Sequence, residues 1–155
     1  MYLFTNFENM TLSTSKSKVC FFFQEVKFTL ARRAELKSFI QSIFKKEGKK
    51  LDSLNYIFVT DKALLDINKQ FLQHDFYTDI ITFDLSASME VQAEIYISID
   101  RVKENASQLG VSFKSELHRV IFHGVLHLCG YKDKTKAESE KMRKMEEVYL
   151  RKYKL

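Results

Sequence analysis

Two of the four histidines in the chain stand close together, at His123 and His127. In a helix, residues four apart lie on one face about one turn from each other, so both imidazoles can reach the same ion. Asp133 follows six positions after His127, behind a glycine that would end a helix, so its carboxylate can fold back as a third ligand. Two imidazoles and one carboxylate leave a coordination position open, which is typical of catalytic zinc sites. The same ligands also suit iron, nickel or cobalt.

The histidine pair alone has a second interpretation, because two helical histidines can simply hydrogen-bond to backbone groups. One class of metalloenzyme is disfavoured. Zinc proteases with an H-E-x-x-H motif carry their glutamate directly after the first histidine, and Gly124 stands there instead. A small residue at this position would let another element pack closely against the helix, or let a substrate approach.

The apolar pattern around the pair predicts a helix that starts at Ser112, runs to about Cys129 and ends at Gly130. We expect this to be the longest and most apolar helix of the chain. Thr135 and Glu138 then form a capping-box pattern, which predicts that a last amphipathic helix begins there.

The rest of the chain reads as alternating strands and helices, with Asp61 and Asp100 as the expected caps of two helices. The sequence therefore predicts one α/β (α+β) domain over residues 19–155, with about four strands in a mixed sheet and about five helices. The metal site would lie at the C-terminal end of the long central helix. Residues 1–18 read as a flexible extension. The remaining elements are one or two short strands over 19–28, strands over 54–59 (buried on both faces), 80–85 and 93–99, and helices over 33–47, from 61 and over 100–110.

Composition bounds the classes of function. The chain has 155 residues, of which 45% are hydrophobic, enough for one domain with a buried core. Its two cysteines exclude a disulfide scaffold and a cysteine-rich zinc module and suit the cytoplasm, while no apolar run approaches the length of a membrane span. The net charge of +5 fits a polyanionic partner such as RNA, and fits equally a solvated lysine-rich surface.

Residues 123–131, HGVLHLCGY, resemble the signature H-G-x-L-H-L-x-G-Y of the YbeY family. Upstream, Asn68 followed by residues 78–83 resembles the family's N…P-T-D-V-L-S-F segment, and residues 93–98 resemble its G-D-I-x-I-S strand. The resemblance runs in order over about residues 19–150, nearly the whole chain.

The resemblance implies a cytoplasmic, zinc-dependent and single-strand-specific endoribonuclease. It would act in maturation of the 3′ end of small-subunit ribosomal RNA and in ribosome quality control. One zinc ion would be held by His123, His127 and Asp133, with no small-molecule cofactor and no membrane partner. The implied partners are single-stranded ribosomal RNA and the small ribosomal subunit with its proteins. The alternative is an RNA-binding assembly factor, catalytically weak or inactive, whose metal is structural.

Two departures from the family pattern matter for the chemistry. Asp133 stands where the family has its third histidine, and Leu72 stands where it has an arginine that acts at the phosphate. A guanidinium clamps developing phosphate charge and leucine cannot. His74 or Lys132 would have to take over, so His74 joins the three ligands as a candidate catalytic residue.

Other residues carry open alternatives. Asp79 and Glu94 would either hold an imidazole N–H or a water at the site, or act as strand-end caps. His118 reads as a surface or structural histidine, and Cys129 as a small core residue. The basic residues of the last helix would touch phosphates or form a solvated face: Lys141, Arg143, Lys144, Arg151 and Lys152.

Overall fold

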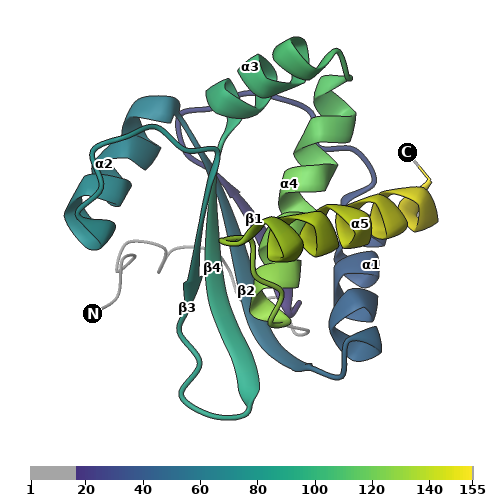
Figure 1. The fold of residues 1–155 in the computed structure, drawn as a ribbon. Coiled ribbons are helices and arrows are strands. Elements are labelled where there is room, and N and C mark those ends of the chain that lie inside the picture. Colours follow the sequence, from purple (N-terminus) through teal and green to yellow (C-terminus); the bar gives the residue numbers. More distant parts are fainter. Residues whose placement is uncertain (1–16, 155) are drawn as a thin grey trace.

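The computed structural model describes residues 17–154 of the chain (Figure 1). Most of the predicted extension over residues 1–18 therefore lies outside the described residues. Lys18 is already tied to the domain, because its carbonyl accepts a hydrogen bond from the Leu54 amide at 2.7 Å and its Nζ donates to the Leu51 carbonyl at 2.9 Å.

Four strands and five helices make up the described part of the chain, which confirms the predicted α/β class. Strands and helices alternate in the first half, and three helices follow one another in the second half. In chain order the elements are β1 (Val19–Phe23), α1 (Arg33–Lys46), β2 (Lys50–Val59), α2 (Asp61–Leu72), β3 (Ile80–Asp84), β4 (Glu90–Ser98), α3 (Ile99–Leu109), α4 (Phe113–Leu128) and α5 (Lys136–Tyr153).

The four strands form one mixed sheet in the order β1-β2-β4-β3. β1, β2 and β4 are parallel, whereas β3 runs antiparallel to β4. Because β3 comes last in this order, among the described residues it is an edge strand that pairs with β4 on one side only.

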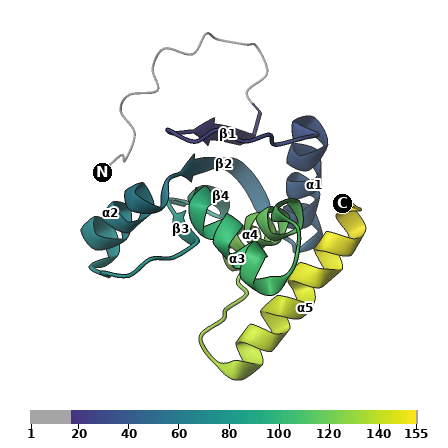
Figure 2. The ribbon, with the colours of Figure 1, turned by 90° about the horizontal axis from the view of Figure 1, so that it is seen from above.

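Helices cover both faces of this sheet (Figures 1 and 2). Successive side chains of β2 point to opposite faces, so Tyr56 and Phe58 enter a large core with α1, α3, α4 and α5, while Ile57 and Val59 enter a smaller core under α2. This arrangement explains the continuous apolar run 54–59 and confirms that the strand is buried on both faces. Among residues 17–154, no helix is both long enough and apolar enough to cross a bilayer.

Two predicted helix caps were wrong by one or two positions. Thr60, not Asp61, caps α2, since its hydroxyl accepts a hydrogen bond from the Ala63 amide at 3.2 Å. Ser98 caps α3 in the same way, while Asp100 accepts a bond from the Asp61 amide at 2.9 Å. The carboxylates are used instead to join the two helix starts, because hydroxyls one or two positions earlier already satisfy the free amides.

Three further features of the elements differ from the prediction. α5 has 18 residues and α4 has 16, so the metal helix is not the longest. β2 begins at Lys50 because its pairing with β4 extends to Glu90. Of the one or two strands expected in 19–28, one forms and it ends at Phe23. Phe28 packs outside any strand against Phe58, with ring centroids 5.1 Å apart. The capping box at Thr135 and Glu138 is confirmed, as are the caps at Ser112 and Gly110.

At Gly124 the helix α4 packs closely against the sheet. A Cβ atom on Gly124 would lie 2.7 Å from Cδ1 of Ile95 on β4 and 3.1 Å from Cδ1 of Ile80 on β3. The first of the two predicted reasons for a small residue is therefore confirmed, because the glycine lets the metal helix sit directly on the sheet.

Candidate metal centre

The histidine pair lies in the last two turns of α4, as predicted. The two rings lie with centroids 4.5 Å apart and nearly perpendicular planes, at 87°. Their side chains are partly exposed, 16% for His123 and 30% for His127, so each can face solvent from a helix whose other side is buried.

The turn after α4 returns Asp133 to this pair. Cys129 ends the helix, Gly130 takes a positive φ of 101°, and the Tyr131 amide donates back to the Leu126 carbonyl at 3.0 Å. A positive φ is unfavourable for residues with a Cβ, so the glycine is what allows the chain to reverse here. Asp133 Oδ2 then lies 3.1 Å from His127 Nε2 and 3.4 Å from His123 Nε2.

These distances fit a single metal ion. One ligand atom from each of His123, His127 and Asp133 lies within 4.8 Å of the others. Two atoms bound to one tetrahedral zinc at about 2.0–2.1 Å are roughly 3.3 Å apart, close to both observed separations between nitrogen and oxygen. The three ligand residues predicted from the sequence are therefore brought together with a spacing that suits zinc-sized ions.

The Nδ1 atom of each histidine has a hydrogen-bond partner of its own. His123 Nδ1 lies 2.6 Å from Oε1 of Glu146 on α5, and His127 Nδ1 lies 2.9 Å from the Tyr131 carbonyl oxygen. Both partners are acceptors, so when the two Nε2 atoms hold a cation each Nδ1 can carry the ring proton and donate it. Such outer partners commonly orient metal-binding histidines.

Glu146 belongs to a buried ionic network behind His123. Arg119 Nη1 donates to Glu146 at 3.1 Å, and its Nη2 donates to Glu116 at 2.7 Å. Burial alone would raise the pKa of Glu146, but the hydrogen bond with His123 and the charge of Arg119 outweigh it and lower the pKa. Glu146 is therefore an anionic acceptor, held at a fixed distance from the metal histidine.

Tyr131 connects His127 to a second carboxylate. Its hydroxyl donates to Oε2 of Glu47, at the end of α1, at 3.0 Å, and Glu47 also accepts a hydrogen bond from the Tyr149 hydroxyl. Tyr131, whose carbonyl contacts His127, is thus linked through Glu47 to α1 and to Tyr149 on α5.

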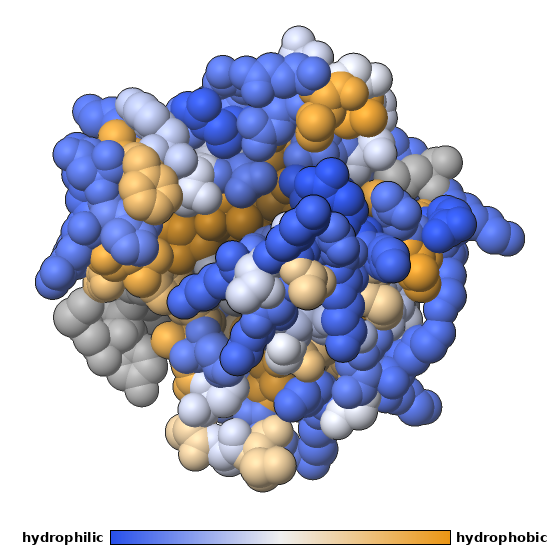
Figure 3. All heavy atoms as spheres, viewed as in Figure 1, coloured by the Kyte–Doolittle hydropathy of each residue, from blue (hydrophilic) through white to orange (hydrophobic). Residues whose placement is uncertain are grey.

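The three ligands open into a cleft of about 690 Å³ between α2, β3 and the α4–α5 turn. In the space-filling view the molecule is hollowed between its α2 and α5 sides, and hydrophobic atoms show in the hollow (Figure 3). Asp79, Asp84 and Asp133 line the cleft against a single lysine, Lys134. A cleft with this excess of carboxylates favours a bound cation and would otherwise repel phosphate.

Asp79 and Glu94, whose roles the sequence left open, lie in different places relative to the cleft. Asp79 lines the cleft, and its Oδ2 lies 3.8 Å from Arg119 Nη2. Burial raises the pKa of Asp79, against the charge of Arg119. Glu94 lies outside the cleft lining and accepts a hydrogen bond from the Tyr96 hydroxyl at 2.8 Å, so the structure does not bring it to the site.

Leu72 and His74 both line the cleft, facing the same space as the ligands. His74 is stacked on Phe76, with ring centroids 5.0 Å apart. Lys132 lies outside the lining of this cleft and lines a neighbouring pocket instead. The five basic residues named on α5 also lie outside it.

His118 is a structural residue, not a surface one. It is 3% exposed, its ring stacks on Tyr153, and its Nδ1 lies 2.7 Å from the Lys114 carbonyl oxygen. Cys129 packs partly buried against the main core, as predicted.

Sequence reasoning missed Glu146, Arg119 and Glu47. A signal for Glu146 existed: it falls on the buried stripe of α5 together with Met142 and Tyr149, where a carboxylate needs a partner. Arg119 lies four residues before His123, on the same face of α4. For Glu47 no local signal exists, since its partner Tyr131 is 84 positions away.

Comparisons with known proteins show which family the chain belongs to. The family model described as Endoribonuclease YbeY matches residues 22–154. A relative named Endoribonuclease YbeY from Cytophaga hutchinsonii is 50% identical over 137 residues, covering 87% of this chain and 96% of the relative. Another of the same name from Flavobacterium psychrophilum is 45% identical over 127 residues, covering 82% and 91%.

A solved structure is also similar. The solution structure of a Thermotoga maritima protein superposes with a TM-score of 0.60 at 28% identity, covering 87% of this chain and 88% of that one. The match of a family model to nearly the whole described chain, and relatives of high identity over most of their length, settle the family. This chain belongs to the YbeY family of endoribonucleases.

Proposed function

We propose that this protein is a cytoplasmic, zinc-dependent endoribonuclease that cuts single-stranded RNA, with ribosomal RNA near the 3′ end of the small subunit as its substrate and the small ribosomal subunit as its partner. The observation that carries the proposal is the convergence of His123, His127 and Asp133 at one end of an open cleft. The relatives named as endoribonucleases support the reaction type.

The residues would act as follows. His123 Nε2, His127 Nε2 and an Asp133 oxygen would hold one zinc ion, which when bound polarises a phosphoryl oxygen and lowers the pKa of water. Glu146 and the Tyr131 carbonyl keep the Nδ1 protons in place, so that both Nε2 lone pairs stay directed at the ion. Hydrolysis adds water across one P–O bond of the RNA backbone. His74 and Lys134, which line the same cleft, are the side chains available to contact a phosphate.

A paired cleavage assay tests the proposal. Wild type and His123→Ala are purified identically and given small-subunit ribosomal RNA, each with zinc and with a chelator. Cleavage only by the zinc-loaded wild type is expected. Equal cleavage by both proteins would mean a contaminating nuclease, and would remove the basis for the proposal.

Metal retention provides an independent readout. His127→Ala is expected to lose its zinc, measured as metal content per chain after gel filtration, because one imidazole and one carboxylate remain. A variant that still holds one equivalent would contradict the ligand assignment.

A second candidate function has one observation in its favour. Leu72 lines the cleft where the family's arginine is expected, and leucine cannot clamp a phosphate. Zinc retention together with salt-sensitive RNA binding, but without cleavage, would assign the protein instead as an RNA-binding assembly factor with a structural metal.

A further inference from the structure

Two exposed aromatic rings stand at the mouth of the metal cleft. His74 and Phe76 lie in the loop between α2 and β3, and their rings are stacked, with centroids 5.0 Å apart and an angle of 21° between their planes. Phe76 is 56% exposed, although it lines the same cleft as the metal ligands. Burying such a ring in a core would be favourable, so an aromatic pair left open beside a site marks a contact surface.

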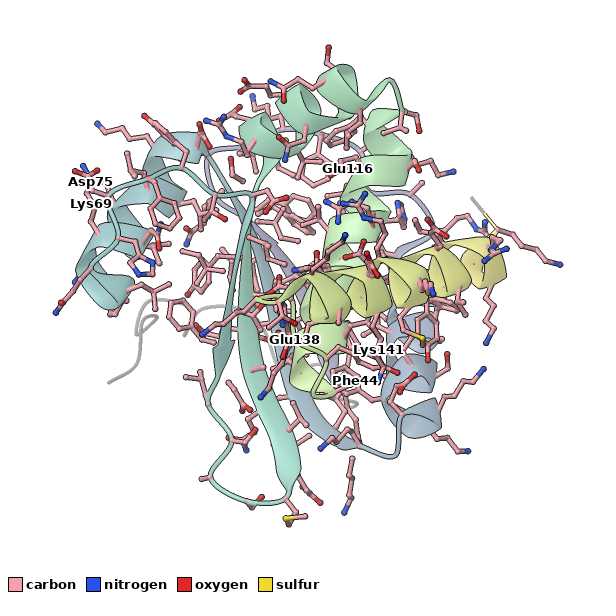
Figure 4. The ribbon with its side chains drawn as sticks, viewed as in Figure 1. Phe44, Lys69, Asp75, Glu116, Glu138 and Lys141 are labelled. Carbon is pink, nitrogen blue, oxygen red and sulfur yellow. The ribbon has the colours of Figure 1, made fainter. Side chains whose placement is uncertain are left out.

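Hydrogen bonds with the buried Asn68 hold the loop that carries these rings. Asn68, which is 1% exposed, donates from Nδ2 to the Phe76 carbonyl at 2.9 Å and accepts at its backbone carbonyl from the His74 amide at 3.2 Å. Lys69 on α2 pairs with Asp75 of the loop at 3.1 Å (Figure 4). The rings are therefore positioned before any ligand arrives, which lowers the entropic cost of binding.

We infer that the His74–Phe76 pair is a stacking platform for one unpaired nucleobase of the RNA strand whose phosphate lies at the metal ligands. This inference rests on the proposed endoribonuclease function and adds to it a defined base subsite. The exposed Phe76 face offers a flat apolar surface, and Lys134 lines the same cleft as a cation for the backbone. An aromatic face beside a backbone-binding site is the arrangement by which proteins hold single strands.

The platform gives a physical reason for a preference for single strands. Inside a duplex both faces of each base are covered by its neighbours, so an internal base can stack on Phe76 only after it leaves the stack. Every base has a π face, so the platform selects unpaired bases without selecting a sequence.

The adjacent residue provides a matched control. Tyr77 is 53% exposed, close to the value for Phe76, but it is absent from the cleft lining, and the Arg101 guanidinium lies over its ring at 5.0 Å. Phe76→Leu and Tyr77→Leu each remove one exposed ring from the same loop and keep an apolar side chain. Both leave the backbone hydrogen bond between Asn68 and the Phe76 carbonyl in place.

The experiment uses a short single-stranded RNA that carries one 2-aminopurine, with 2′-O-methyl riboses and phosphorothioate linkages so that it is not cut. Zinc-loaded wild type is expected to quench the 2-aminopurine fluorescence on binding. Phe76→Leu is expected to bind about five-fold or more weakly and to quench less, as loss of one base–aromatic stack predicts. Tyr77→Leu is expected to stay close to wild type, and annealing a complementary strand is expected to abolish the difference.

Equal quenching and affinity for Phe76→Leu and wild type would overturn the platform, as would an equal loss in Tyr77→Leu. Cleavage of the unmodified strand separates the two proposals. Wild type that cuts this strand while Phe76→Leu binds normally leaves the endoribonuclease standing and the platform wrong. A selective loss in Phe76→Leu without cleavage by wild type supports the platform in an RNA-binding protein that is not a nuclease. Wild type that neither binds nor cuts contradicts both.

Discussion

The Nδ1 atom of His123 and the Oε1 atom of Glu146 lie 2.6 Å apart, although the two residues belong to different helices. Glu146 is 4% exposed and is held in turn by Arg119. A metal histidine is therefore oriented by a buried carboxylate whose own position is fixed, an arrangement that makes ligand geometry depend on the packing of α5 against α4.

Glu146→Gln is expected to weaken zinc binding by roughly 10- to 100-fold, the usual effect of changing an outer partner of a metal ligand. The amide oxygen can still accept from His123, but the negative charge beside the ring is gone. Competition with a chromogenic chelator measures the affinity. Glu147→Gln, an exposed change at the next position of α5, serves as the control and should bind zinc normally. Equal affinity in both variants would show that the carboxylate does not tune the site.

Leu72→Arg is expected to strengthen RNA binding and to speed cleavage, because a guanidinium would enter the cleft lining at the position of the family arginine. The site tolerates the change, since Leu72 is 40% exposed. One added phosphate contact should steepen the slope of log affinity against log salt by about 0.7 on a single strand. Leu72→Gln, polar but uncharged, should leave that slope as in wild type. An unchanged slope in Leu72→Arg would show that position 72 does not face the RNA backbone.

Gly124→Ala is expected to destabilise the protein by up to about 2 kcal/mol. The new methyl group would meet Ile95 Cδ1 at 2.7 Å in a closed core, and overpacking costs typically ~1–3 kcal/mol. The higher helix propensity of alanine offsets only about 1 kcal/mol of this cost in unfolding free energy. Urea unfolding measures the difference. In an Ile95→Val background the clashing atom is absent, so the same glycine change should cost less there. An equal cost in both backgrounds would place the strain elsewhere.

His118 should make stability depend on pH. Burial lowers its pKa, and the charges of Lys114 and Arg32 act in the same direction, against the hydrogen bond with the Lys114 carbonyl. The folded protein thus binds this proton more weakly than the unfolded chain does, so stability is full above the ordinary pKa of about 6.5 and falls as the pH drops below it. His118→Gln cannot titrate and should lose less stability between neutral pH and pH about 5. Urea midpoints at both pH values, for wild type and variant, test this. Parallel losses would assign the pH dependence to other groups.

Local patterns carried most of what could be predicted. The i, i+4 spacing of His123 and His127, the glycine at position 130 and the capping box at Thr135 each act within a few residues, and all three were placed correctly. At the start of α2 the sequence pattern favoured Asp61, which belongs to a stronger capping type, although Thr60 beside it makes the cap. That choice depends on how far β2 extends and on Asp61 pairing with Arg101, 40 positions away.

Features that depend on contacts between distant segments could not be predicted from the sequence. The strand order β1-β2-β4-β3 follows from contacts between segments far apart in the chain, which no local spacing encodes. The same holds for the partners of the metal histidines. His123 was predicted from its neighbours, whereas Glu146 reaches it from another helix, 23 positions later.

The three ligand residues fall within eleven consecutive positions, 123 to 133, yet the groups that orient the two imidazoles are anchored at Glu47 and on α5. A peptide of those eleven residues would contain every ligand and lack both anchors. Metal affinity is therefore linked to the assembly of α1, α4 and α5. By thermodynamic linkage, zinc should raise the unfolding temperature, and a fault in any of these helices should weaken zinc binding. The ion would report whether the chain has finished folding.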